Sequence, residues 1–143
     1  MLAKNRHRSW DGEFMKSILY AAALVALSSN LAAADTITAK EIAAGISENK
    51  TELEQESWWN DNMADRPHEI TGNVADVQKG ALSGYWVHLN IGNGITAMCG
   101  FEAEQKSVVQ SLRKGDRFTC KGKVSSTWTA VFGPSFNIDC SAQ

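Results

Sequence analysis

The sequence predicts a mostly β fold with accessory helices, an α+β arrangement built around one small sheet. Three observations carry this prediction. Apolar residues recur at helical spacing before Pro67, and five segments after it alternate between apolar and polar residues. A second helical segment separates the third alternating segment from the fourth. The length of 143 residues suggests a single domain.

The first 34 residues have the three-part pattern of a secretory signal peptide. Met15 and Lys16 precede an apolar run at 18–27, and small residues supply an A-x-A cleavage site at 32–34. The apolar run is shorter than the roughly 20 residues that span a bilayer, so a retained membrane anchor is the weaker alternative. We therefore expect a periplasmic or secreted protein with no membrane anchor after signal cleavage.

Residues 1–14 fit this pattern less well, because Asp11 and Glu13 are out of place in a basic n-region. Either the true start is Met15, or residues 1–14 form an extended n-region. After the signal peptide at 1–34, we expect an N-terminal helix and linker at 35–66 and a five-stranded domain at 67–143.

The charge of the mature chain argues against nucleic acid as a partner. Residues 35–143 contain ten Lys and Arg against fourteen Asp and Glu, a formal net charge of −4. Proteins that bind nucleic acid draw most of their affinity from cations that neutralise phosphates. An acidic exported domain lacks that excess of cations.

The segment after the signal peptide predicts one helix. Thr38 and Glu41 form a capping box, which marks the first turn. Ile42, Ile46 and Leu53 then recur at roughly helical spacing, so the helix has one apolar stripe. This helix would cover one open end of the sheet that follows.

Pro67 marks the change to alternating segments. In the segment 68–77, Ile70 and Val74 share one face, whereas Val77 breaks the parity, so we expect a β-bulge near 75–76. The segments 85–91 and 95–101 follow, with a turn signal between them. Their expected inward-facing residues are Tyr85, Val87, Leu89, Ile91, Ile95, Ala97, Cys99 and Phe101.

Residues 102–115 predict a second helix, with Val108, Val109 and Leu112 on one face and Gly115 as its stop signal. Strands at 116–124 and 135–140 complete the pattern. Their expected inward-facing residues are Phe118, Cys120, Val124, Phe136, Ile138 and Cys140. Five short strands with a helix between the third and fourth are typical of the OB-fold, a five-stranded Greek-key barrel.

Several stretches of the chain resemble one known family. They are TAKEIAAGISENKTE, EITGNVADV, YWVHLN, MCGF, LRKGDRFTCKGKV and FNIDC. Over about residues 36–141, the chain resembles the tRNA-anti-like OB-fold family of exported bacterial proteins. The resemblance implies an OB-fold and implies no catalytic residue. The family name records a distant likeness to anticodon-binding domains.

All three cysteines lie on expected inward faces. In an OB-fold the fifth strand neighbours both the third and the fourth, so Cys140 could pair with Cys99 or with Cys120. Loop entropies of roughly 4 and 3 kcal/mol do not decide between them. The resemblance implies the Cys99–Cys140 disulfide and leaves Cys120 as a buried, inert thiol. Three reduced core cysteines are the alternative, and the absence of a Cys-x-x-Cys pair argues against a zinc site.

The basic segment LRKGDRFTCKGKV allows two interpretations. Alternation places Arg117, Lys121 and Lys123 on the outer face of a strand. The simpler interpretation is a solvated strand whose charges discourage edge pairing. The alternative is a surface that binds single-stranded nucleic acid or another polyanion. No aromatic residue accompanies the cations on that outer face, as a single-strand binder would need.

A binding surface is predicted on the outer face of the second and third strands, where OB-folds usually bind. This face carries Trp86, His88 and Met98, and the loop before the last strand adds Trp128. The alternative is that Trp86 and Trp128 pack beneath a helix or loop. We expect these four residues to bind a protein or a small ligand.

The sequence shows no arrangement that is typical of an enzyme. It contains no paired nucleophile and base, no carboxylate dyad and no glycine-rich phosphate loop. We therefore expect a non-enzymatic binding module that uses no cofactor.

Overall fold

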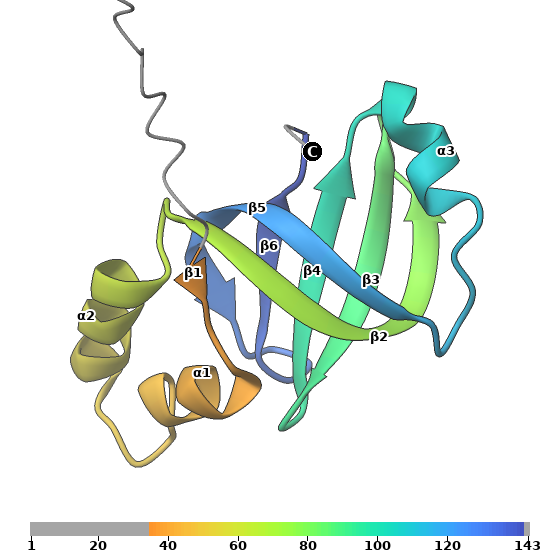
Figure 1. Cartoon of the computed structure of the whole chain (residues 1–143). Coiled ribbons are helices and arrows are strands. Elements are labelled where there is room, and N and C mark those ends of the chain that lie inside the picture. Colours follow the sequence, from red (N-terminus) through yellow and green to blue (C-terminus); the bar gives the residue numbers. More distant parts are fainter. Residues whose placement is uncertain (1–34, 142–143) are drawn as a thin grey trace, which may run out of the picture.

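The computed structural model describes residues 35–141, which form a six-stranded sheet with short helices around it (Figure 1). The predicted signal peptide lies outside the described residues. The strands are β1 (Asp35–Thr36), β2 (Pro67–Lys79), β3 (Tyr85–Gly92), β4 (Ile95–Phe101), β5 (Arg117–Thr129) and β6 (Ser135–Asp139). Their order is β1-β2-β3-β4-β6-β5, and β5 also pairs with β2. Five strands, β2 to β6, therefore close into a ring.

The two-residue alternation predicted for β3 and β4 is confirmed. Val87 and Leu89 on β3 are buried, and all four expected residues of β4 are buried as well. Asn93 and Gly94 connect the two strands, and both have positive φ, at 51° and 72°. Positive φ at both central residues matches the twist of a tight hairpin, which explains the Asn-Gly sequence here.

The ring closes because each of the two long strands, β2 and β5, pairs with two neighbouring strands. β2 pairs with β5 up to Asn73 and with β3 from there on. β5 pairs with β2 up to Lys123 and with β6 from there on. The predicted bulge in β2 is confirmed, because the register shifts between Val74 and Asp76. The mostly β character with accessory helices is confirmed too.

Glycines stand next to both points where a long strand changes partner. A Cβ atom on Gly72 would lie 2.7 Å from the carbonyl oxygen of Asn90. A Cβ atom on Gly122 would collide with the carbonyl oxygen of Asp139. The neighbouring backbones therefore approach closely only because these positions have no side chain.

The expected single N-terminal helix is wrong, because the chain forms two helices, α1 (Ala39–Gly45) and α2 (Glu52–Asn62). Each begins with a capping box, Thr38 with Glu41 in α1 and Thr51 with Glu54 in α2. The second box starts a new helix in place of continuing the first. Leu53, expected on the apolar stripe, is consequently 76% exposed.

The helix between β4 and β5 is shorter than expected. A 3₁₀ turn, η1 (Ala103–Gln105), leads into α3 (Lys106–Val109). Val109 is buried as expected, whereas Val108 is exposed. Gly115 does not stop this helix directly, because it lies in a later turn, where its N–H donates to the carbonyl of Val74.

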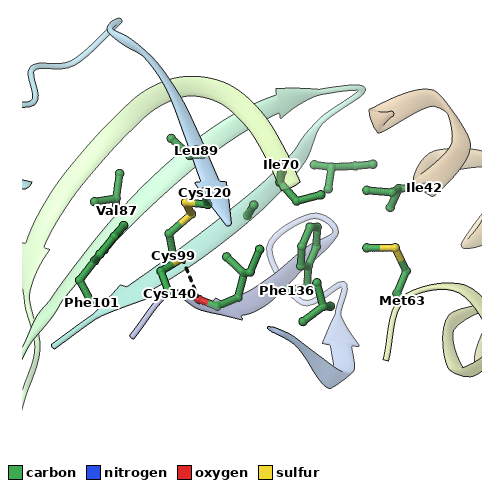
Figure 2. Packing of buried hydrophobic residues seen from close by; sticks show 14 of the residues in the cluster. Ile42, Met63, Ile70, Val87, Leu89, Cys99, Phe101, Cys120, Phe136 and Cys140 are labelled. Carbon is green, nitrogen blue, oxygen red and sulfur yellow. Dashed lines mark hydrogen bonds between the residues drawn. A yellow bond between two sulfur atoms is a disulfide. The ribbon is translucent and has the colours of Figure 1, made fainter. Parts of the chain in front are cut away.

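The core fills the ring and extends to its N-terminal helices (Figure 2). Ile42 from α1 and Met63 after α2 join Ile70 and Phe136 in one buried cluster. Trp59 of α2 packs edge-on against Phe136, with ring centroids 5.4 Å apart. In Figure 1, α1 and α2 lie at one end of the ring and α3 lies at the other.

Within residues 35–141, no helix combines the length and apolar character that a membrane span requires.

Candidate binding site

The outer face of the ring carries two neighbouring rows of side chains across β3, β4 and β6. In one row, Trp86 lies opposite Gly100, which pairs in turn with Asp139. In the next row, His88 lies opposite Met98, which pairs with Asn137. Three of the residues predicted to bind, Trp86, His88 and Met98, are therefore direct neighbours.

Trp86 covers a glycine of the adjacent strand. A Cβ atom on Gly100 would lie 3.1 Å from Cζ3 and 3.2 Å from Cη2 of the Trp86 indole. The six-membered part of the indole thus occupies the space above Gly100. Trp86 is partly buried, but among the described residues it is not one of those that pack against the hydrophobic core. Its position therefore needs an explanation other than core packing.

Three adjoining hollows lie along this surface. The largest, about 340 Å³, has Trp86, Glu102, Lys123, Asn137 and Asp139 in its wall. A second, about 210 Å³, is lined by Gln78, Trp86, His88, Met98 and Asn137. A third, about 140 Å³, extends from Met98 and Asn137 to Trp128. Because neighbouring hollows share Trp86, Met98 and Asn137, they form one continuous surface. We call the residues Trp86, His88, Met98 and Asn137 the Trp86 face.

Trp128 packs against the core and does not share the face of Trp86, because it pairs in register with the buried Phe136. Its ring centroid lies 6.3 Å from that of the buried Trp59. The indole N–H of Trp59 donates to the carbonyl of Ser125 at 3.2 Å, which fixes this pair beside β5. Trp128 also lines a separate hollow of about 340 Å³ between α2 and β5, together with Glu52 and Glu56. Trp128 therefore packs between β5 and α2, as the alternative expectation has it.

A charged group borders the Trp86 face on β2. Asp76 pairs in register with His88, and its carboxylate accepts a hydrogen bond of 2.8 Å from the Gln78 amide. This hydrogen bond, together with Lys114 at 3.7 Å, lowers the pKa of Asp76 below its ordinary value. Asp76 therefore stays ionised at neutral pH and adds negative charge at this edge.

The basic strand lies against carboxylates. Lys121 is 3.2 Å from Glu69, and Lys123 is 3.2 Å from Asp65. Arg117, at the start of β5, is exposed. Two of the three cations predicted for polyanion binding thus already have acidic partners.

The disulfide expected between Cys99 and Cys140 is wrong, because Cys99 bonds to Cys120 and Cys140 is the free, buried thiol. The expectation considered only cysteines on strands that are neighbours in the sheet. Cys99 on β4 and Cys120 on β5 do not meet that condition, because β6 lies between these two strands. Across the interior of the ring, however, the Cα atoms of Cys99 and Cys120 are only 6.3 Å apart. Figure 2 shows this bond inside the core, with Cys140 beside it.

The cysteine cluster does not offer a metal site in this state. The three sulfur atoms lie within 4.8 Å of one another, but two of them form the disulfide. Burial raises the pKa of Cys140 to about 12, with a smaller contribution from Asp139. The thiol donates instead to the carbonyl of Ile138 at 3.7 Å. Cys140 is therefore protonated and unreactive while the ring is closed.

Sequence reasoning missed one buried polar side chain, His68. Its imidazole is 1% exposed, with Nδ1 3.3 Å from the Asp35 carbonyl and Nε2 3.0 Å from the Asn62 carbonyl. The His68 side chain on β2 therefore contacts the backbone of both β1 and the end of α2. Its parity with Ile70 and Val74 was the signal for an inward position.

Comparisons with known proteins give little beyond this geometry. No protein-family model matches the sequence, and no curated protein matches it. Among solved structures, the chain is similar to one described as a "putative aspartyl-tRNA synthetase from Leishmania major Friedlin", at 11% sequence identity and a TM-score of 0.45. The similarity covers 78% of this chain and 21% of that chain, so this chain spans about a fifth of that protein.

Proposed function

We propose that the protein is an exported, non-enzymatic OB-fold module that binds a ligand through the Trp86 face. The OB-fold assignment is supported by the closed order of β2, β3, β4, β6 and β5, with α3 between β4 and β5. Export is supported by the signal-peptide pattern at 1–34 and by the disulfide, because disulfides persist in oxidising compartments. Membership of the tRNA-anti-like family stays a prediction.

One observation carries the binding proposal. Trp86 and Met98 are large apolar side chains that stand on the outer face of the ring, outside the core cluster. They line hollows that also expose the polar groups of His88 and Asn137. A concave surface with apolar walls and a few polar groups is the usual form of a ligand site.

Nuclear magnetic resonance of the labelled protein with a library of small fragments tests the proposal. We expect the chemical-shift changes to gather at Trp86, Met98 and Asn137. Trp86→Ala should abolish them, because it removes the shared wall of two hollows. Leu53→Ala serves as the control, since Leu53 is exposed on α2. Shifts that gather elsewhere, or that persist in Trp86→Ala, would contradict the proposed site.

Native mass spectrometry provides a second test. Protein purified from its own compartment should carry extra mass if the Trp86 face retains its ligand. The same extra mass should be absent from Trp86→Ala protein prepared in parallel.

A further inference from the structure

The buried imidazole of His68 stands between two backbone carbonyl groups. Its Nδ1 lies 3.3 Å from the carbonyl oxygen of Asp35 in β1, and its Nε2 lies 3.0 Å from the carbonyl oxygen of Asn62, the last residue of α2. A carbonyl oxygen only accepts hydrogen bonds, so each ring nitrogen needs its own N–H to bond there. A neutral imidazole has one N–H, whereas the imidazolium ion has two. The charged form alone therefore satisfies both contacts.

In the neutral form, one of these contacts brings two acceptors together. The lone pair of the unprotonated nitrogen then points at a carbonyl oxygen, in a site where His68 is 1% exposed. A buried polar group that loses its partner destabilises the contact it stood in. The contact to Asp35 is the longer of the two, so we expect the neutral ring to keep its proton on Nε2 and to lose the bond to β1.

The end of α2 favours a positive charge at His68. The last carbonyl groups of a helix lack partners within the helix and form the negative end of its dipole. No basic residue lies in the last turn of α2. His68 reaches this end from β2, so an imidazolium ring supplies the cation that the helix itself lacks. A protonated histidine at the C-terminus of a helix is a favourable arrangement.

The charged groups around His68 do not oppose a positive ring. Its register partner on β5 is Gly122, which carries no charge. Lys121 and Lys123 flank Gly122, and each has a carboxylate oxygen 3.2 Å from its Nζ. The charged residues beside the His68 contacts, on β1, α2, β2, β5 and the linker before β2, are Asp35, Asp61, Asp65, Arg66, Glu69, Lys121 and Lys123. Acidic residues outnumber basic ones in this set, so no excess of positive charge disfavours the imidazolium ion.

The strand β1 depends on the His68 contact because few other contacts hold it. It has two residues, both exposed, and within the sheet of residues 35–141 it pairs with β2 alone. Asp35 lies opposite His68 in that pair, and Thr36 lies opposite Glu69. The next residue, Ile37, packs partly against the core. Loss of the His68 bond would therefore free Asp35 and Thr36 and leave the rest of the fold in place.

We propose that His68 is a pH-sensitive clasp, which holds β1 on β2 while its ring is charged and releases Asp35 and Thr36 when the ring loses its proton. Release uncovers the edge of β2 at His68 and Glu69, beside the end of α2. Histidine suits such a switch because its charge changes between about pH 5 and 8, whereas carboxyl groups and lysines ordinarily titrate outside that interval. The inference is independent of the ligand site proposed at the Trp86 face.

Nuclear magnetic resonance of the isotope-labelled, full-length protein tests the clasp directly. We expect two ring N–H groups on His68 at about pH 5 and one, on Nε2, at about pH 8. Over the same interval the backbone order parameter of Thr36 should fall from about 0.85, typical of rigid backbone, to below about 0.6. A single N–H on His68 throughout would overturn the proposal. So would a Thr36 order parameter that stays constant while the ring titrates.

Two variants assign the effect to His68. His68→Gln keeps a polar side chain but has no charge to lose, so the order parameter of Thr36 should no longer depend on pH. His88→Gln is the matched control, because His88 is the other histidine of residues 35–141 and lies on β3, which pairs with β2 and β4. This control should respond to pH as the unmodified protein does.

The variants also show what would contradict the clasp. A fall in the Thr36 order parameter that persists in His68→Gln would assign the pH response to another group and overturn the proposal. A response that disappears in His88→Gln would do the same. If His68→Gln does not fold, the ring and backbone measurements on the unmodified protein decide the matter alone.

Discussion

At the residue scale, the cysteine cluster shows how a closed ring brings together positions that are far apart in the sheet. Cys99 and Cys120 are 21 residues apart and lie on strands that do not pair with each other. Closing a loop of this length restricts the unfolded chain and stabilises the fold by about 3 kcal/mol in the loop-entropy model. Cys140 remains beside them as a protonated thiol in the core.

Replacing Cys120 by Ala should move the disulfide to Cys99 and Cys140. The sulfur atoms of this pair already lie within 4.8 Å, so a modest side-chain rotation brings them together. Counting thiols in denatured, non-reduced protein checks this expectation, with peptide mapping to identify the bond. The unmodified protein should show one free thiol and Cys120→Ala none. Two free thiols in Cys120→Ala would show that Cys99 does not pair with Cys140, and would contradict this prediction.

At the scale of the elements, both N-terminal helices depend on the same capping device. The Thr38 and Thr51 hydroxyls accept hydrogen bonds from the N–H groups of Glu41 and Glu54. The two carboxylates accept in return, at 2.8 Å from each threonine N–H. These bonds, from the Thr38 and Thr51 side chains and backbone, lower the pKa of Glu41 and Glu54 below the ordinary 4.5.

The double variant Thr38→Ala/Thr51→Ala should be less stable at pH 7 by about 1 kcal/mol for each cap. A carboxyl group whose pKa is lowered in the folded state adds stability above its unfolded pKa, and loses it as the pH falls through its folded pKa. The difference between the double variant and the unmodified protein should therefore shrink on acidification below about pH 4.5. Urea unfolding from pH 7 to 3 measures it, and a constant difference would contradict this account.

Among the glycines of the strands, Gly122 is the one where an added methyl group should reduce the stability of the fold most. A Cβ atom there would strike the backbone carbonyl of Asp139, where β5 passes from β2 to β6. We expect Gly122→Ala to lower the unfolding free energy by about 3 kcal/mol, as overpacking does. Gly100→Ala is the matched control, because the atoms nearest to its Cβ belong to the movable Trp86 side chain and not to backbone. Equal urea midpoints for the two variants would contradict this reading.

The strands were predictable from the sequence because alternation is a local property. The parity of Val87, Leu89 and Cys99 follows from the pleat, and the break at Val77 marks the β2 bulge. The outer positions of Trp86, His88 and Met98 follow from the same parity. The predicted surface residues are therefore neighbours in the structure.

Other features depend on the way the chain packs in three dimensions. The Cys99–Cys120 bond crosses the interior of the ring, and sheet order alone does not reveal that approach. β1 is two residues long, too short for any periodicity to show. The break between α1 and α2 had a local signal in Thr51 and Glu54, but the apolar spacing to Leu53 outweighed it.

At the scale of the whole molecule, charge is distributed so that the basic strand is balanced by acidic neighbours. Lys121 and Lys123 lie at 3.2 Å from Glu69 and Asp65 respectively. Exposed pairs of this kind add less than about 1 kcal/mol to stability. Their larger effect is on the surface potential, because they cancel a stripe of cations on an otherwise acidic domain.

Removing those acidic partners should create a polyanion surface. We expect the unmodified protein to pass through a heparin column at low salt and Asp65→Asn/Glu69→Gln to be retained. The control, Glu56→Gln/Asp61→Asn, changes the net charge equally on α2 and should not be retained. Strong retention of the unmodified protein, with affinity falling steeply in salt, would instead favour polyanion binding through Arg117, Lys121 and Lys123.

The place of β6 in the ring has a consequence for how the protein is made. Among the six strands of residues 35–141 it is synthesised last, yet it fits between β4 and β5 and supplies the only bridge between them in this sheet. Until residues 135–139 leave the ribosome, β4 and β5 each have an open edge on that side. Open edges of this kind promote association between nascent chains. Chaperone protection during synthesis would therefore matter most in the interval between the completion of β5 and the arrival of β6.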